Sequence, residues 1–148
     1  MKQLLLALAG LSFINGAGAE LISIRAQDYV SSENVKSGAT DGYGDVIITR
    51  PPGKIPTSAS YEFDVQSAGD YQLSLRYAAA DPRPIFVSVN GQQITGNAAS
   101  STTGGWMPGN QIEQGIGTVR LRKGKNSILL SRDSDFPHIS KIILDGPR

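Results

Sequence analysis

The chain has 148 residues, no cysteine and a formal net charge of +1 at pH 7. The lack of cysteine excludes disulfides and thiol catalysis, and the near-neutral charge lacks the basic field that a nucleic-acid-binding protein needs. The length is that of one domain with its own hydrophobic core, while 17 glycines and 8 prolines favour many turns over long helices.

The N-terminus has the layout of a secretory signal peptide. Lys2 supplies a positive charge, residues 4–14 form an apolar run, and residues 17–19 are a small-x-small cleavage pattern. The run is shorter than the roughly 20 residues of a membrane-spanning helix, and no other stretch approaches that length. We therefore expect a signal peptide over residues 1–19, a mature domain without a membrane span over residues 20–148, and a secreted or periplasmic location.

The mature chain shows the two-residue alternation of β-strands and no sustained helical period. Over residues 71–77 apolar and polar side chains alternate strictly, as in a strand with one wet face. Asn90-Gly91 between two strand-like runs predicts one β-hairpin, and residues 123–126 predict the turn of a second. Short strands separated by turn residues predict an antiparallel sandwich or barrel. In chain order, the expected strands cover residues 22–26, 46–49, 61–65, 71–77, 85–89, 92–94, 119–121, 128–130 and 139–144.

Two long connections, residues 31–44 and 95–109, are expected to be loops, which at this length are usually functional or disordered. Each carries an aromatic residue among glycines, Tyr43 in the first and Trp106 in the second. Sugars pack their C–H patches on aromatic rings, and their hydroxyls bond to planar amide, carboxylate or guanidinium groups. Trp106 is therefore either part of a sugar site or a plug that closes one end of the sandwich.

Catalytic motifs are weak. His138 is the only histidine, no Gly-x-Ser-x-Gly elbow accompanies it, and the usual His/Cys zinc site is excluded. A glycosidase needs two opposed carboxylates, for which the candidates are Glu62, Asp64, Asp133 and Asp135. Glu62 and Asp64 are expected to share the solvated face of one strand, and nothing in the sequence marks any of the four as catalytic. Residues 133–135 (Asp-Ser-Asp) either offer oxygen ligands to Ca²⁺ or form a polar turn.

Several segments of the mature chain match those of a known family in order and spacing. They are Ile24–Tyr29, Tyr61–Val65, Gly69–Ala78, Arg83, Val87–Gly91, Thr103–Trp106 and Pro137–Ile142. Together they resemble the family 6 and family 35 carbohydrate-binding modules. The resemblance implies an all-β fold, an antiparallel β-sandwich of jelly-roll type, and a non-catalytic domain that binds carbohydrate.

The resemblance also implies a glycan cleft among loops at one end of the sandwich. Trp106 would stack on a sugar ring, Tyr43 would form the other wall, and His138 would stand near the family's hydrogen-bonding Asn. With Asp41 and Arg83 as polar partners, these residues are our candidate carbohydrate-binding set. A histidine at this place could make binding depend on pH near its ordinary pKa of roughly 6.5.

The chain departs from the family pattern at two places. The Glu pair of the family's structural calcium site is replaced by Arg25 and Gln27. A cation opposite Ca²⁺ is unfavourable, so we expect no metal or cofactor, and a salt bridge from Arg25 to Asp145 in place of calcium. Gly109 stands where the family often has another aromatic residue.

Three functions compete at this stage. The first is a binding module for an extracellular polysaccharide or oligosaccharide, working beside a separate secreted glycosidase or an envelope component. The second is a structural or protein-interaction sandwich that has lost the sugar site, and the third is a small hydrolase. The position of Trp106 relative to Tyr43 and His138 separates the first two.

Overall fold

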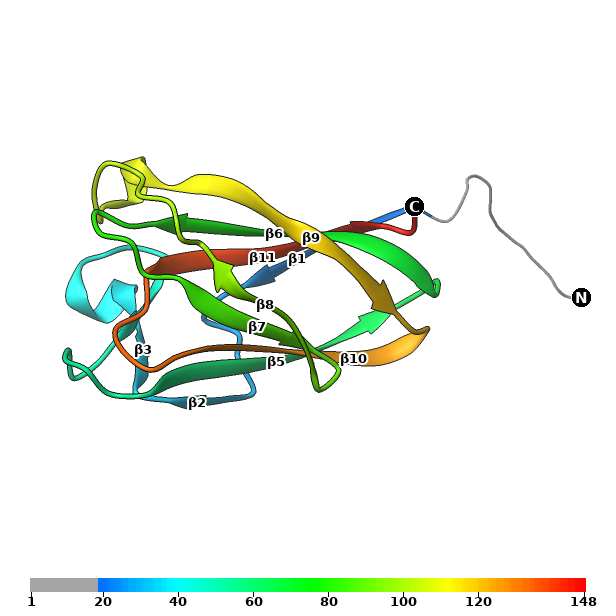
Figure 1. Ribbon diagram of the computed structural model, residues 1–148, viewed down its shortest axis with the longest axis horizontal. Coiled ribbons are helices and arrows are strands. Elements are labelled where there is room, and N and C mark those ends of the chain that lie inside the picture. Colours follow the sequence, from blue (N-terminus) through cyan, green and yellow to red (C-terminus); the bar gives the residue numbers. More distant parts are fainter. Residues whose placement is uncertain (1–18) are drawn as a thin grey trace, which may run out of the picture.

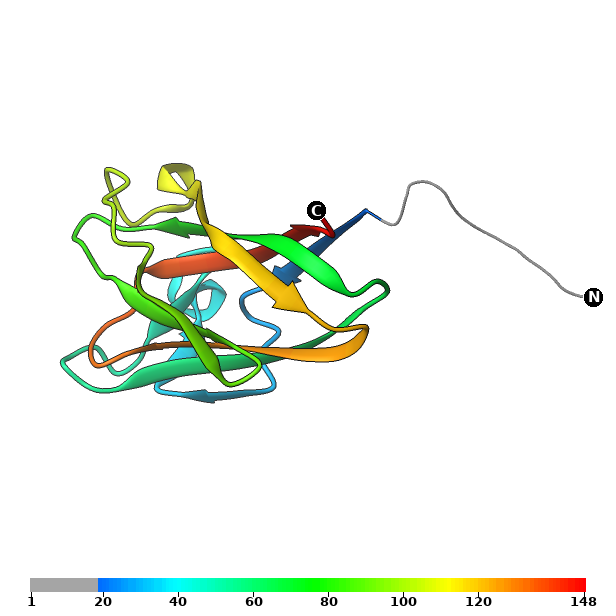
Figure 2. The same cartoon turned by 45° about the vertical axis from the view of Figure 1, so that its right-hand side comes forward.

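The strict alternation around residues 71–77 extends over a longer strand, β6 (Gly69–Ala78), in which Tyr71, Leu73, Leu75 and Tyr77 are fully buried. The computed structural model describes residues 19–148, so the expected signal peptide lies outside the described residues except for its last position. Figures 1 and 2 show that the described chain forms two face-to-face β-sheets. The prediction of an all-β, antiparallel sandwich is therefore confirmed.

Each sheet is antiparallel, and successive strands from β5 onward largely alternate between the sheets, as in a jelly roll. One sheet has the order β3 (Val35–Ser37), β4 (Ile47–Thr49), β11 (His138–Gly146), β6, β9 (Ile112–Leu121), with β1 (Glu20–Arg25) also pairing with β11. The other has the order β2 (Ser31–Glu33), β5 (Thr57–Val65), β10 (Gly124–Arg132), β7 (Ile85–Val89), β8 (Gln92–Ala98).

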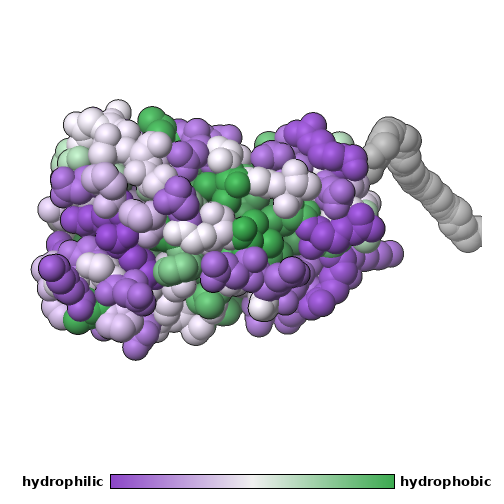
Figure 3. All heavy atoms as spheres, in the orientation of Figure 1, coloured by the Kyte–Doolittle hydropathy of each residue, from purple (hydrophilic) through white to green (hydrophobic). Residues whose placement is uncertain are grey.

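The core lies between the two sheets and is closed by hydrogen-bonded tyrosines. Tyr61 donates its hydroxyl to the carbonyl of Ala26 at 2.7 Å, and Tyr77 donates to the carbonyl of Ser101 at 2.8 Å. A buried hydroxyl without a partner would be costly, so these bonds let large aromatic rings fill the core. In Figure 3, exposed apolar residues gather near the middle of the view, between the edge strands β8 and β9.

Every expected strand is present, but one expected loop is not a simple loop. Residues 31–44 contain β2, β3 and the short 3₁₀ helix η2 (Gly38–Asp41). All three residues of β2 are exposed, and the strand is held by backbone pairing to β5, so its sequence has no apolar alternation to reveal it. Likewise β8 continues to Ala98, which shortens the second expected loop.

Both expected hairpins form. Asn90 and Gly91 have φ values of 50° and 81°, as a two-residue type I′ turn requires. The second turn is tighter than expected, because β10 already begins at Gly124. Asn126, which we placed in that turn, is instead a fully buried strand residue.

Candidate functional site

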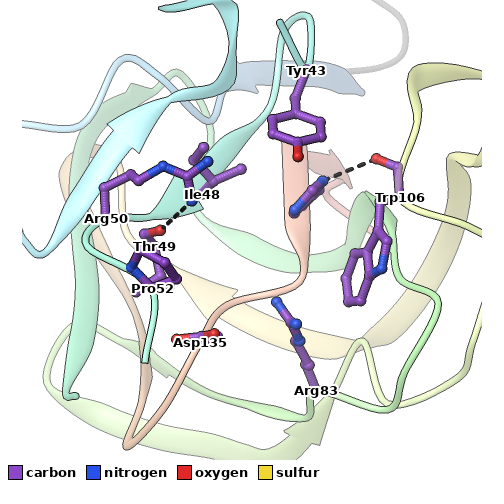
Figure 4. Close-up of a pocket in the computed structure, with 9 residues that line it drawn as sticks. Tyr43, Ile48, Thr49, Arg50, Pro52, Arg83, Trp106 and Asp135 are labelled. Atoms are coloured by element: carbon purple, nitrogen blue, oxygen red, sulfur yellow. Dashed lines mark hydrogen bonds between the residues drawn. The ribbon is translucent and has the colours of Figure 1, made fainter. Parts of the chain in front are cut away.

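Loops from both sheets meet at one end of the sandwich (Figure 1). Their side chains line a pocket of about 180 Å³ (Figure 4). Hydrogen bonds between the loops hold them in place at this end. Thr103 donates its backbone N–H to the carbonyl of Ala79 at 2.7 Å, and Asp135 accepts from the Gly53 N–H at 2.8 Å. The lining residues are Tyr43, Ile48, Thr49, Arg50, Pro52, Arg83, Trp106, Asp135 and His138.

Three aromatic rings form a continuous row along the pocket, with His138 in the middle. The Tyr43 ring meets the His138 ring edge-on at 5.0 Å between centroids, and the Trp106 ring lies 4.8 Å from His138 on a tilt of 42°. His138 is the first residue of β11, and its Nδ1 lies 2.9 Å from the carbonyl oxygen of Trp106. The expected aromatic pair is therefore brought to one pocket, but separated by the histidine.

Trp106 closes one end of the core, as one of the two alternatives above expected, while its part in a sugar site stays a prediction. It is half-buried and packs against the hydrophobic core, and it also lines the pocket. The preceding glycines are required by the loop: Gly104 has a φ of 93°, and a Cβ on Gly105 would lie 2.4 Å from Oδ1 of Asn110. That Asn110 oxygen accepts from the Met107 N–H at 3.1 Å, so the loop has a defined shape that positions Trp106.

Arg83 covers one face of the indole. Its guanidinium carbon lies 4.1 Å from the centroid of the Trp106 ring, and its Nη1 donates to the carbonyl of Phe136 at 2.9 Å. Burial lowers the pKa of Arg83, but the ordinary value is so high that the group stays charged. A sugar that stacks on Trp106 therefore uses the other face of the ring or displaces the guanidinium.

Burial also lowers the pKa of His138 below its ordinary value of 6.5, and the Arg83 and Arg50 charges lower it further. The hydrogen bond to the Trp106 carbonyl works in the opposite direction, because it favours the protonated ring. At neutral pH the ring is thus neutral. Since a carbonyl can only accept, Nδ1 carries the proton and Nε2 keeps its lone pair.

Asp135, Arg50 and Pro52 line the pocket but were not in our candidate set. In the sequence, these residues lie in the proline-rich connection after β4 and in the polar turn before β11. The two segments meet through Gly53 and Asp135, which are 82 positions apart, and nothing in the sequence indicated that contact. Figure 4 shows Asp135 and Arg83 across the pocket from Tyr43. Asp41 ends η2, and its side chain lies outside the part of the chain that the structure describes.

The salt bridge expected from Arg25 to Asp145 is wrong. Arg25 pairs in two hydrogen bonds of 2.9 Å with Asp28, and Asp145 pairs instead with Arg148. The reason is register: Arg25 lies opposite Lys141 on β11, four residues from Asp145 along that strand. No group of three or more potential metal ligands occurs within residues 19–148 as far as these are described, and the absence of calcium stays a prediction.

Of the four carboxylates considered for a hydrolase, only Asp135 lines the Trp106 pocket, and Glu62, Asp64 and Asp133 do not. Glu62 and Asp64 are both exposed on β5, as expected, and Glu62 lies 3.5 Å from the ammonium of Lys125. No helix in residues 19–148 has the length and apolar character to cross a membrane.

Comparison with known proteins connects this geometry to a class of folds. No protein-family model and no curated protein sequence matches the chain. Solved structures do match. A family 35 carbohydrate-binding module from Clostridium thermocellum shares 21% identity over 84% of this chain and 97% of that one, with a TM-score of 0.66.

Two further structures agree. The C-terminal family 6 module of a marine laminarinase from Zobellia galactanivorans shares 22% identity over 86% of this chain and 100% of that one, with a TM-score of 0.69. A family 35 module from Paenibacillus barcinonensis shares 16% identity over 83% and 97%, with a TM-score of 0.67. The chain therefore has the fold of the family 35 and family 6 carbohydrate-binding modules, as the sequence resemblance implied.

Proposed function

We propose that this chain is a secreted or periplasmic, non-catalytic domain that binds an extracellular polysaccharide or oligosaccharide in the pocket of Trp106, His138 and Tyr43. The observation that carries the proposal is the row of three aromatic rings beside the charged side chains of Arg83 and Asp135. Apolar ring faces suit the C–H patches of a sugar, and charged or planar groups suit its hydroxyls.

The polar groups in the pocket complement both roles of a sugar hydroxyl. Nε2 of neutral His138 and the carboxylate of Asp135 accept hydrogen bonds, while the Arg83 guanidinium donates them. A pocket of about 180 Å³ is smaller than the roughly 300–1,000 Å³ of sites for drug-sized ligands. We therefore propose that it holds about one sugar unit of a longer chain.

One observation favours the alternative of a sandwich without sugar binding. The Arg83 guanidinium already covers one face of the Trp106 ring. A protein that had lost sugar binding could keep the ring covered in this way. Under this alternative the partner is a protein, such as a secreted glycosidase or an envelope component. The two functions differ in whether Trp106 responds to glycans.

Trp106 is the only tryptophan, so intrinsic fluorescence reports this pocket directly. We expect a saturable change in its emission when neutral, acidic and host-type glycans are titrated in turn, with at least one class giving a response. Free N-acetyltryptophanamide in the same solutions corrects for absorption by the glycans. Unchanged emission across the whole panel, together with no heat of binding by calorimetry, would contradict the proposal.

The lowered pKa of His138 predicts how binding depends on pH. Affinity is expected to be constant above about pH 6.5 and to fall as the pH drops through the lowered pKa, because protonation removes the Nε2 acceptor. Stability follows the same direction. The unfolded chain binds this proton at the higher pKa, so the contribution to stability is complete above about pH 6.5 and is lost on acidification.

His138→Asn removes this titration while retaining an amide that can bond to a sugar hydroxyl. Calorimetric dissociation constants at several pH values between about pH 5 and pH 7.5 measure the effect. The variant is expected to give a flat profile. An equal slope in both proteins would assign the pH dependence to groups other than His138.

A further inference from the structure

The three aromatic rings of the Trp106 pocket come from three separate segments of the chain. Tyr43 lies in the loop after η2, Trp106 lies in the loop before the short 3₁₀ helix η3 (Pro108–Asn110), and His138 begins β11. The centroids of neighbouring rings are 5.0 and 4.8 Å apart. A binding surface built from separate segments keeps its shape only when further contacts hold those segments at fixed positions.

One side chain, that of Gln111, links these three segments. Gln111 directly follows η3 and belongs to the second of them. Its Nε2 donates to Oδ1 of Asp45, two residues after Tyr43, at 3.1 Å. Its Oε1 accepts from Oγ of Ser140, two residues after His138, at 2.8 Å. The amide therefore connects the three segments close to their aromatic residues.

Ser140 is the extra residue of a β-bulge in β11. The register of β11 against β6 shifts between Ile139 and Lys141, which leaves Ser140 without a partner on β6. Ser140 is 1% exposed, so its hydroxyl needs a partner inside the protein, and the shorter of its two hydrogen bonds goes to Gln111. Bulges commonly redirect side chains beside functional sites. The bond to Gln111 thus holds the part of β11 that carries the His138 ring into the pocket.

The chemistry of the partners requires an amide at position 111. Arg76 donates its Nε–H to the same Oε1 of Gln111 at 2.9 Å, and an arginine has no acceptor. An ionised carboxylate such as that of Asp45 only accepts. A side chain that bridges these groups must accept with one atom and donate with another, which glutamine does and glutamate does not.

Gln111 does not itself line the Trp106 pocket. With Asp45 and Arg76 it lines a polar hollow of about 430 Å³ on the outer face of the sheet that contains β6 and β11. Gln111 can therefore act on a sugar in the Trp106 pocket only through the segments that it connects. This distinguishes it from the residues that line the pocket, which can contact the sugar directly.

We propose that Gln111 is a positioning residue of the Trp106 pocket. Its amide sets the spacing of the three aromatic rings, and through that spacing the affinity for a glycan. The inference rests on the proposed function in taking the ligand of this pocket to be a glycan. It adds that the binding surface depends on a hydrogen-bonded network outside the pocket.

Gln111→Glu tests this role with almost no change in size. Glutamate can still accept from the two donors, but it cannot donate to Asp45, and two carboxylates that face each other repel. We expect the glycan dissociation constant, measured by calorimetry, to rise about tenfold. The loss is not complete, because a second contact supports the same loops: a Cβ on Gly44 would lie only 3.0 Å from Cγ of Pro108.

Adding Asp45→Asn to Gln111→Glu restores the bridge with its polarity reversed, because the new amide donates to the new carboxylate. We expect this double variant to bind within about twofold of the unaltered protein, since the two changes compensate each other. Asp45→Asn alone is expected to bind normally, because its amide oxygen still accepts from Gln111. Gln72→Glu is the matched control, since it adds the same charge on β6 and lines neither the pocket nor the hollow.

The aromatic rings report the same geometry when no glycan is present. The chain has one tryptophan and one histidine, so the indole and the imidazole each give a single set of NMR signals. Each ring shifts the signals of its neighbour by an amount that depends on their distance and tilt. We expect both sets of signals to move in Gln111→Glu and to return in the double variant.

Either unchanged affinity or ring signals that stay in place in Gln111→Glu would overturn the inference. A double variant that binds as weakly as Gln111→Glu would also overturn it, because a loss of direct contact or of general stability is not reversed at Asp45. If the unaltered protein binds no glycan, the proposed function fails, and the ring signals alone then decide the role of Gln111. Should Gln111→Glu not fold, Gln111→Asn, whose amide is too short to reach both segments, is measured in its place.

Discussion

Trp106→Ala is expected to reduce glycan affinity at the Trp106 pocket by about thirtyfold or more. Truncating a central aromatic residue at a binding site costs about 2 kcal/mol or more, which corresponds to this factor. The variant loses the ring that packs beside His138 and the surface on which the Arg83 guanidinium lies. Isothermal calorimetry with the glycan that gives the strongest fluorescence response measures the change.

Met107→Ala is the matched control for this experiment. Met107 is the next residue in the loop, is 51% exposed, and does not line the pocket. It is expected to retain full affinity. Because Trp106 also packs against the core, circular dichroism must show that the alanine variant is folded. Wild-type affinity in a folded Trp106→Ala protein would place the glycan elsewhere on the molecule.

Asn126→Ala is expected to lower the free energy of unfolding by about 2–4 kcal/mol. The buried Asn126 amide donates to the carbonyls of Arg122 and Gly124 at 2.8 and 3.1 Å. It accepts from the Arg122 N–H at 3.1 Å and from the Asn90 amide at 2.9 Å. Alanine leaves these part-buried groups without their partner and removes the side-chain link between the two hairpin turns.

Asn97→Ala provides the comparison, because Asn97 is an exposed asparagine in a strand and its side chain makes no hydrogen bond with residues 19–148. It is expected to change stability by less than about 0.5 kcal/mol. Urea denaturation of both variants, with unchanged slopes, gives the two free energies. Equal stability in the two variants would contradict the expectation that the Asn126 hydrogen bonds stabilise the two hairpin turns.

Local pattern was enough to predict most strands, but not all of them. The alternation in β6 and the Asn90-Gly91 turn have local physical causes, namely a two-sided pleat and a turn that needs positive φ. The edge strand β2 has no local pattern that predicts it, because its three residues are all exposed. Only its backbone pairing to β5 makes it a strand. Asn126 was misplaced for a related reason, since its burial depends on Asn90 and the second turn together.

The candidate site divides in the same way. Sequence alone picked out Trp106, Tyr43, His138 and Arg83, which line one pocket, because glycine-rich loops and a resemblance marked them. The order of the rings, with His138 between the other two, depends on contacts between residues 32 or more positions apart.

Residues of the chain by themselves determined the all-β class, the hairpins and the loops that carry aromatic rings, because each follows from local backbone preference and side-chain periodicity. Tertiary structure alone decided that Arg25 lies away from Asp145, that Arg83 lies on the Trp106 ring, and that Asp135 joins the pocket. These positions depend on strand register and on the packing of loops distant in sequence, which no local preference specifies.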